Sequence, residues 1–421
     1  MKASKHAYNG INNTITSPNF IMEKPKICFL TSSFPHYNGD THGIFVYHLA
    51  RHLSQTAEMR VVCPYYTEST NKKEVMGGCQ IIRFHYFYPT RLQLITSGFG
   101  IADNIRKNPF FILQFPFYIT SQFFTALKQL LHCNIIHTNW ILSGFVGVLL
   151  KKITKKPLII TLRGSDIKLS LQQPLLKQLS LLVLHNADAI TSVSSRITKQ
   201  VIQLGIPSAK TSFIPNGVDT NIFKPRNKKT QRKKLKLPLD SNILLYVGRI
   251  SKAKGIDILL ESFAKLHRKH HKTKLYFIGD GDIADFKEKT QSLHLSDNVH
   301  FIGSLPQHEI AAYYSAADLF ILPSLAEGRP NVVLEALASG TPVVTTDVGD
   351  VRAFMTHEQN GFIVPPGDAL KLAAHMNKLL SGRTLQQKFS RAGLKTIKDH
   401  QLSWNRAAQQ YLAVYKQLLT K

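Results

Sequence analysis

Short apolar runs separated by stretches of helical periodicity recur along the whole chain. Residues 26–31 (KICFLT) are mostly apolar, residues 34–43 are rich in Pro, Asn and Gly, and residues 44–53 carry apolar side chains at helical spacing. A short run that is apolar throughout is typical of a strand buried on both faces of a parallel sheet. The pattern therefore predicts strand–loop–helix units from the start of the chain onward.

Repetition of this unit predicts an α/β protein with two doubly wound, Rossmann-like domains. A chain of 421 residues is too long for one ordinary core and fits two domains of roughly 200 residues each. In the first domain we expect strands at residues 26–31, 60–63, 80–84, 134–137, 158–162 and 189–193. In the second we expect strands at residues 243–247, 275–279, 299–303, 319–322, 342–344 and 360–364, and helices at residues 330–339, 369–380, 385–398 and 404–419.

Turn residues and charge place the boundaries of the two domains. The sequence FIPNGVD at residues 213–219 ends the first domain, and residues 221–225 are the expected hinge. We therefore assign residues 22–220 to the first domain and residues 226–398 to the second. The basic run at residues 226–236 contains no acidic residue and is interpreted as a solvated face, because no nucleic-acid-binding fold accompanies it.

The two ends of the chain have different characters. Residues 1–21 lack the apolar stretch of a secretory signal, so we expect a disordered extension, with Met22 as an alternative start. Residues 399–421 contain a helical pattern whose apolar side must pack on another part of the protein.

The charge balance points to an anionic partner. Lys and Arg number 53 against 26 Asp and Glu, which gives a formal net charge of +27. This balance suits a nucleic acid, a phospholipid surface or a phosphorylated substrate, and it does not choose among them. Four cysteines, none in a C-x-x-C pair, indicate neither a zinc site nor a disulfide framework, so a reducing cytoplasm is the expected compartment. They are Cys28, Cys63, Cys79 and Cys133.

No apolar run is expected to cross a bilayer. Residues 141–150 stop at a pair of lysines and residues 109–120 are interrupted by Pro116, so both fall short of the roughly 20 residues that a spanning helix needs. Residues 86–131 alternate aromatic with basic side chains, which fits either contact with a membrane surface or a domain core. We therefore expect a soluble or peripheral protein.

A ligand site is predicted around residues 322–350, LPSLAEGRPNVVLEALASGTPVVTTDVGD. Pro330 and Gly340 mark the two ends of a helix, and Glu327 lies in the loop before it. Glu335 lies about one and a half turns into that helix, and helical side chains lean toward the N-terminus, so both carboxylates can overlook one pocket.

The start of this helix favours an anion. The N–H groups of residues 328–332 and the helix dipole attract negative charge. In the structural alternative, Glu327 only complements the dipole and Glu335 lies on a solvated face. The apolar neighbours of Glu335 leave little room for such a face, so we favour the ligand site.

Glu327 and Glu335, followed by ALASG and PVV, resemble the E-x7-E signature of the retaining family-4 glycosyltransferases of GT-B fold. The resemblance implies two domains that face each other across a cleft, with the acceptor on the first, the nucleotide-sugar donor on the second, and a terminal helix that crosses back. It also implies that Glu327 contacts hydroxyls of the donor sugar and that Glu335 holds the nucleotide ribose. The N–H groups expected to meet the diphosphate are those of Gly328, Arg329, Asn331 and Val332.

The resemblance assigns roles to five further residues. Arg249 and Lys254 stand where the family neutralises the departing diphosphate, a task that needs fixed cations close by. Gly39, in Asn-Gly-Asp where the family usually has two adjacent glycines, is expected beside the donor phosphates, and Gly279 near the base. Arg163 replaces a common histidine; because a guanidinium cannot act as a base, it is expected to bind donor phosphate or an acidic sugar.

No metal and no other cofactor is expected. The pair Asp280 and Asp282 matches the Asp-x-Asp metal motif of the other major glycosyltransferase fold only superficially, since it lies late in a doubly wound domain. Other polar clusters are interpreted as helix caps or surface residues. These are Ser165, Asp166, His267, His270 and His271.

The predicted reaction is retaining transfer of a hexose-type sugar from a UDP- or GDP-sugar to a hydroxyl. We expect a lipid-linked glycan acceptor in cell-surface polysaccharide or lipopolysaccharide assembly, with an anionic membrane surface and no nucleic acid among the partners. The expected location is the cytoplasm, peripheral at the inner face of the membrane. Two alternatives stay open: a GT-B sugar-nucleotide epimerase, and a non-catalytic basic binding protein on a degenerate glycosyltransferase frame.

Overall fold

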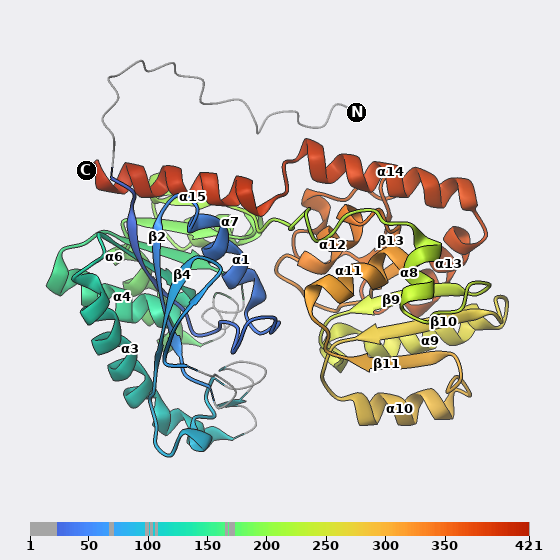
Figure 1. The fold of residues 1–421 in the computed structure, drawn as a ribbon, viewed down its shortest axis with the longest axis horizontal. Helices are drawn as coiled ribbons and strands as arrows, with labels where there is room; N and C mark the ends of the chain where they lie inside the picture. The colour runs from blue at the N-terminus through green and yellow to red at the C-terminus, as the bar shows by residue number, and fades with distance from the viewer. Residues whose placement is uncertain are drawn as a thin grey trace.

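The structure, a computed structural model, describes residues 23–66, 71–96, 101, 104–105, 108–164, 167 and 173–420. The predicted disordered extension, Met22 and the predicted caps Ser165 and Asp166 lie outside these residues. Within them the chain forms two α/β domains that stand side by side (Figure 1). The prediction of two doubly wound domains is thereby confirmed.

The first domain is built on an eight-stranded sheet with the order β3-β4-β2-β1-β5-β6-β7-β8. All neighbouring strands are parallel except β3 and β4. The strands are β1 (Lys26–Leu30), β2 (Glu58–Pro64), β3 (Lys73–Met76), β4 (Cys79–Phe84), β5 (Ile135–Asn139), β6 (Leu158–Leu162), β7 (Ala189–Ser192) and β8 (Thr211–Phe213). Its helices are α1 (Ile44–Leu53), η1 (Thr90–Leu92), η2 (Pro109–Gln114), α3 (Phe115–Leu130), α4 (Trp140–Thr154), α6 (Pro174–Asn186), α7 (Ser195–Gln203) and η3 (Ser208–Lys210).

The second domain has a six-stranded, fully parallel sheet with the order β11-β10-β9-β12-β13-β14. Its strands are β9 (Asn242–Val247), β10 (Thr273–Ile278), β11 (Val299–Gly303), β12 (Leu319–Leu322), β13 (Val343–Thr346) and β14 (Phe362–Val364). The helices after the first domain are α8 (Lys228–Lys234), η4 (Lys252–Lys254), α9 (Ile256–His267), α10 (Ile283–Ser292), α11 (Gln307–Ala316), α12 (Asn331–Ala338), η5 (Val351–Ala353), α13 (Ala369–Leu380), α14 (Arg383–Asp399) and α15 (Trp404–Leu419).

Helix α15 returns to the first domain and lies along it (Figure 1). Its aromatic residues join the core formed by β1 and α1, where Trp404, Tyr411 and Tyr415 are buried. The hydroxyl of Tyr415 lies 2.6 Å from Nδ1 of the buried His137 on β5. This polar contact inside an apolar core favours one position of α15 on the first domain, because a shifted helix would leave the Tyr415 hydroxyl and His137 Nδ1 without each other as partners.

The chain crosses between the domains twice, and the two crossings touch. The N–H of Val218 donates to the carbonyl of Leu402 at 3.0 Å. A side chain on Gly217 has no room, since a Cβ there would lie 2.1 Å from the carbonyl carbon of Ser403. The two segments that connect the domains, around residues 217–218 and 402–403, therefore lie against each other, and together they are called here the hinge.

One prediction about the first domain is wrong. Pro116 does not interrupt the apolar stretch, because it lies in the first turn of α3, where a helix needs no N–H from it. Helix α3 continues directly from η2, and Pro109–Leu130 is, by length and composition, the one helix within the described ranges that can cross a membrane. Only 22% of its most apolar window is buried inside the protein.

Candidate functional site

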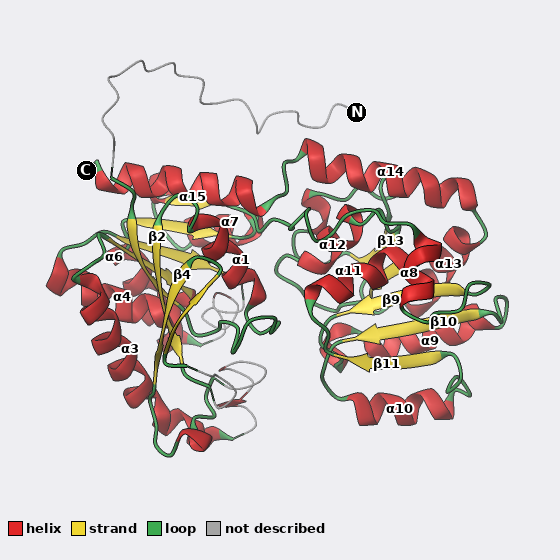
Figure 2. Ribbon diagram, viewed as in Figure 1, coloured by secondary structure: helices red, strands yellow, loops and turns green. Residues whose placement is uncertain are grey.

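The strands of the second sheet end on the side of that domain that faces the first domain. The arrowheads of β9, β10 and β11 all point toward the first domain (Figure 2). In open parallel sheets the loops after the carboxyl ends of strands form the ligand site. The loop after β12, residues 323–330, is called here the Glu327 loop.

Glu327 is held by two side chains. Nζ of Lys254 lies 2.7 Å from its Oε1, and the hydroxyl of Ser324 donates to the same oxygen at 2.8 Å. Lys254 reaches this position because Gly255, at φ +68°, lets the chain pass against the carbonyl of Pro323; a Cβ would lie 2.1 Å from that oxygen. The structure thus brings together a carboxylate and a cation that the sequence assigns to one site.

Glu335 lines the cleft from the second turn of α12. The hydroxyl of Tyr314 on α11 contacts its Oε2 and the carbonyl of Val332, each at 3.1 Å. Burial raises the pKa of Glu335 to about 7, although the hydrogen bond from Tyr314 acts in the opposite direction. A carboxylate in such a position gains from any ligand hydroxyl that donates to it.

Helix α12 is shorter than predicted by one residue at each end. It runs over Asn331–Ala338, with Pro330 as the residue before its first turn and Gly340, at φ +72°, after its end. The N–H groups of Asn331 and Val332 open the helix and have no partner within it. The N–H groups that are predicted to meet an anion therefore stand at the start of this helix.

Arg163 lies across the cleft at the end of β6. Its guanidinium donates to Oδ1 of Asn139 at 2.7 Å and to Oδ1 of Asn216 at 3.0 Å. Nδ2 of Asn216 then lies 3.3 Å from Oδ1 of Asn331 at the start of α12. A polar chain thus joins the first domain to the predicted diphosphate site.

Arg329 points away from the open cleft. Its side chain is only 2% exposed, and the guanidinium carbon lies 4.9 Å from the centre of the Phe354 ring. Its Nη1 lies 3.9 Å from Oδ2 of Asp350. The prediction for Arg329 concerns only its backbone N–H group. The side chain has a separate, structural role, because it packs on Phe354 and lies near Asp350.

The remaining predicted residues lie at loop ends. Arg249 follows β9 and is half-buried, and its carbonyl accepts the hydroxyl of Tyr246 at 2.7 Å. A Cβ on Gly279 would lie 2.1 Å from the carbonyl oxygen of Gly248, so this glycine is required for close approach of two backbones. Gly39 is exposed in the loop after β1, with φ +101° and open space around it.

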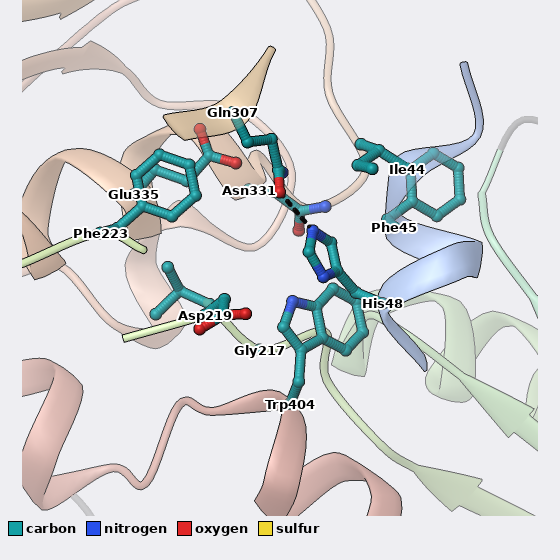
Figure 3. Close-up of a pocket in the computed structure, with 11 residues that line it drawn as sticks. Ile44, Phe45, His48, Gly217, Asp219, Phe223, Gln307, Asn331, Glu335 and Trp404 are labelled. Atoms are coloured by element: carbon teal, nitrogen blue, oxygen red, sulfur yellow. Dashed lines mark hydrogen bonds between the residues drawn. The ribbon is translucent and has the colours of Figure 1, made fainter. Parts of the chain in front are cut away.

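A narrow pocket between the two domains is lined by Glu335 and by the hinge residue Gly217 (Figure 3). There Nε2 of His48 on α1 lies 2.6 Å from Oε1 of Gln307 on α11, which links the domains. The ring of His48 stacks on Trp404 at a centroid distance of 5.7 Å. Burial lowers the pKa of His48 to about 4, so the ring is neutral near pH 7.

Several residues of the site escape sequence reasoning. Tyr314, Asn216, His48 and Asp350 act through contacts with residues distant in sequence, so no local spacing marks them. Within the described part of the chain, no three His, Cys, Asp or Glu side chains form a group that could hold a metal ion. The four cysteines are buried free thiols, as a disulfide-free framework predicts.

Comparison with known proteins identifies the class. The family model described as "Glycosyltransferase Family 4" matches residues 42–222, and "Glycosyl transferases group 1" matches residues 227–396. The solved structure of Anabaena Alr3699/HepE in complex with UDP-glucose covers 94% of this chain and 100% of that one, with a TM-score of 0.73 and 19% identity. The two facing domains are therefore a GT-B fold.

Curated relatives extend over most of the chain. The glycosyltransferase TuaC of Bacillus subtilis (strain 168), whose name refers to teichuronic acid biosynthesis, is 28% identical over 83% of this chain and 87% of its own length. The capsular polysaccharide biosynthesis glycosyltransferase CapM of Staphylococcus aureus is 26% identical over 65% and 75%. The chain belongs to the glycosyltransferases whose two domains these models describe.

Proposed function

We propose that the protein transfers a hexose-type sugar from a UDP- or GDP-sugar to a hydroxyl, with retention at the anomeric carbon. The observation that carries this proposal is the 2.7 Å contact of Lys254 with Glu327 beside the start of α12. Lys254, from the loop after β9, thereby supplies a cation beside a carboxylate that can accept from sugar hydroxyls, and both lie near a helix start whose N–H groups favour an anion. A GT-B protein solved with UDP-glucose, HepE, supports a nucleotide sugar as donor.

In the proposed reaction the bond between the anomeric carbon and the diphosphate oxygen breaks. The acceptor oxygen forms a bond to the same carbon on the same face, and its proton goes to the departing phosphate. Arg249 and Lys254 stabilise the negative charge that develops on this phosphate, together with the N–H groups of Gly328, Arg329, Asn331 and Val332. This route needs no protein base, which agrees with a permanently charged Arg163 in the acceptor domain.

We assign the donor contacts as follows. Glu327 accepts from hydroxyls of the sugar, and Glu335 accepts from the ribose. Gly39 lies beside the phosphates, Gly279 approaches the base, and Arg163 binds a phosphate or an acidic sugar. Each assignment rests on the family resemblance and on the position of the residue at the cleft.

The cations at the cleft make a divalent metal unnecessary in this scheme, because Arg249, Lys254 and the helix dipole already supply positive potential. A chelator such as EDTA should leave the rate unchanged. Loss of activity with EDTA and recovery with Mn²⁺ would instead assign a metal to Asp280 and Asp282.

The proposed acceptor is a lipid-linked glycan of cell-surface polysaccharide or lipopolysaccharide assembly. The names of TuaC and CapM, which refer to teichuronic acid and capsular polysaccharide biosynthesis, support a polysaccharide product. The proposed location is the inner face of the cytoplasmic membrane.

The outer face of η2 and α3 supports membrane contact. Apolar residues along it are more than half exposed, and they recur at intervals of one or two helical turns. They are Phe110, Leu113, Phe117, Phe124 and Leu131. The opposite face packs into the first domain through Tyr118, Gln122, Ala126 and Leu130.

A helix with one face in a protein core cannot be surrounded by lipid. We therefore propose that Pro109–Leu130 lies in the membrane surface rather than across it. The basic cluster KKITKK contains Lys151, Lys152, Lys155 and Lys156. Lys151 pairs with Asp188, and Lys156 donates to the carbonyls of Leu130 and Cys133. Lys152 and Lys155 are exposed, and each adds attraction to anionic lipid worth about 1 kcal/mol near the surface.

A thermal-shift screen of nucleotide sugars tests the donor. A ligand that binds only the folded state raises the stability of that state by RT ln(1 + [L]/Kd). The melting temperature should therefore be higher with the true donor than with the free sugar or the nucleoside. Product formation with an added acceptor, and the anomeric configuration of that product by NMR, then test transfer and retention. Conversion of the donor without any acceptor would instead support an epimerase, and the lack of any shift a non-catalytic binding protein.

A further inference from the structure

Asp350 contacts the Glu327 loop and the first domain at once. It follows β13 in the second domain and is 5% exposed. Its N–H donates to the carbonyl of Gly328 in the Glu327 loop at 3.0 Å. Its Oδ2 accepts the N–H of Ser195, in the first domain, at 2.7 Å, and also lies 3.9 Å from Nη1 of Arg329.

The contact with Ser195 is well matched in charge. Ser195 is the first residue of α7 (Ser195–Gln203), so its N–H has no partner inside that helix. A carboxylate at this position gains from the helix dipole and from a charge-assisted hydrogen bond. The hydroxyl of Ser195 lies 3.4 Å from the other carboxylate oxygen of Asp350.

The backbone of the Glu327 loop is enclosed at the same place. Gly349, at φ +57°, lies against the loop so closely that a Cβ would come within 2.3 Å of the carbonyl oxygen of Gly328. On the other side, a Cβ on Gly328 would lie 3.3 Å from the carbonyl oxygen of Arg163 in the first domain. The Gly328 peptide is thus fixed between Asp350 and the opposite domain.

We propose that Asp350 is a positioning residue that ties the arrangement of the two domains to the conformation of the Glu327 loop. The inference rests on the proposed function, because it gives that loop the donor. While Ser195 is bound, the Asp350 main chain holds the Gly328 carbonyl, and the neighbouring N–H groups keep the direction that a diphosphate requires. When the domains separate, the carboxylate of Asp350 loses its partner in the first domain, and the loop relaxes.

Two substitutions act on the contact from opposite sides. Asp350→Asn keeps the size of the side chain and an oxygen that can accept the Ser195 N–H, but it removes the charge that strengthens this hydrogen bond. Ser195→Pro removes the donating N–H at the first position of a helix, where proline is well tolerated and needs no change of φ. Ser194, the preceding residue, has extended backbone angles of φ −138° and ψ 135°, which a following proline permits.

The matched control is Ser195→Ala, which removes the hydroxyl and keeps the N–H. Hydrogen exchange of the full chain is measured for peptides that cover residues 324–332, with peptides from α13 as an internal reference. In Asp350→Asn and Ser195→Pro the exchange of residues 324–332 should rise by about tenfold, the effect of losing one charge-assisted hydrogen bond. Ser195→Ala and the α13 peptides should stay near wild type.

Kinetics give a second readout. The loosened loop carries the N–H groups assigned to the departing diphosphate, so both variants should lower kcat by about tenfold, with a smaller rise in the donor KM. The double variant should lose no more than Ser195→Pro alone, since both substitutions act on the same contact.

Unchanged exchange of residues 324–332 in Ser195→Pro overturns the proposal, and so does an equal rise in Ser195→Ala. Exchange that rises equally in α13 would show general destabilisation and also contradict it. These outcomes do not depend on activity. A wild-type protein that neither binds nor consumes a nucleotide sugar would refute the proposed function, while the exchange data still decide whether Asp350 holds the loop.

Discussion

Nζ of Lys254 and Oε1 of Glu327 lie 2.7 Å apart, although the two residues follow different strands of the second sheet. Glu327 follows β12 and Lys254 follows β9, which are neighbours in that sheet. Because parallel neighbours end at the same edge, residues separated by 73 positions meet there. This ion pair fixes the position of the carboxylate before any donor arrives.

Removal of Glu327 and removal of Glu335 should change different kinetic quantities. Glu327→Ala should mainly lower kcat, because it removes a contact to the sugar that reacts. Glu335→Ala should mainly raise the donor Kd, because it removes a contact to the ribose. Each loss should cost about 1–3 kcal/mol, or roughly five- to a hundredfold. Steady-state kinetics and calorimetry separate the two effects, with Glu309→Ala as an exposed control on α11; wild-type values in both variants would end the assignment.

Glu335 should make stability depend on pH. Its pKa is raised from 4.5 to about 7 in the folded protein, so the folded state binds more protons than the unfolded state between these values. The contribution of Glu335 to the free energy of unfolding is therefore fully present below about pH 4.5. It is lost as the pH rises through 7, by up to about 3 kcal/mol.

His48 acts with the opposite sign, since its pKa is lowered from 6.5 to about 4. Its contribution is present above pH 6.5 and is lost as the pH falls toward 4. The effect of Glu335 must therefore be read as the difference between wild type and Glu335→Gln in urea unfolding at several pH values. The stability of wild type relative to this variant should fall from pH 4.5 to pH 7; a constant difference would contradict the raised pKa.

The exposed face of α3 should bind anionic vesicles. Phe117 and Phe124 are 55% and 56% exposed. Replacing both with Ser should reduce flotation with anionic liposomes at low salt, and added salt should reduce it further, because charges are screened within roughly 8–10 Å. Leu370→Ser is the matched control, since Leu370 is 67% exposed on the second domain. A wild-type protein that stays in the soluble fraction would remove the membrane proposal.

The hydroxyl of Tyr415 should contribute to stability. In Tyr415→Phe, Nδ1 of His137 loses its partner inside the core, which should lower the free energy of unfolding by about 1–3 kcal/mol. Tyr37→Phe is the control, because Tyr37 is 48% exposed and its change should lie within about 0.5 kcal/mol of wild type. Equal stability of the two variants would show that the His137 contact does not fix α15.

The sequence is most informative where one residue property repeats locally. The strands at residues 158–162 and 319–322 are found with the predicted limits, because both are apolar apart from Thr161 and a Gly or Pro follows each within two residues. The sequence does not predict strand β3, since Lys73–Met76 is short, antiparallel and polar at two of its four positions. Pro116 predicts an interruption of the apolar run at residues 109–120, whereas in the structure it lies in the first turn of α3.

The residues of the candidate site also differ in how far the sequence predicts them. Glu327 and Glu335 stand at a fixed spacing within one loop and helix, so the sequence alone brings them together. The contact of Ser195 with Asp350 joins residues 155 positions apart and depends on the arrangement of two domains. Neither residue lies in a distinctive pattern, and only the folded structure shows that they meet.

The position of α15 has a consequence for biosynthesis. The core around β1 and α1 includes Trp404, Tyr411 and Tyr415, which leave the ribosome after the whole second domain. The first domain therefore leaves the ribosome before the second, but its core is complete only after α15 has been synthesised. Until that moment an apolar surface around β1 stays uncovered in the nascent chain, and a separately expressed piece ending at the hinge would keep that surface exposed unless α15 were supplied with it.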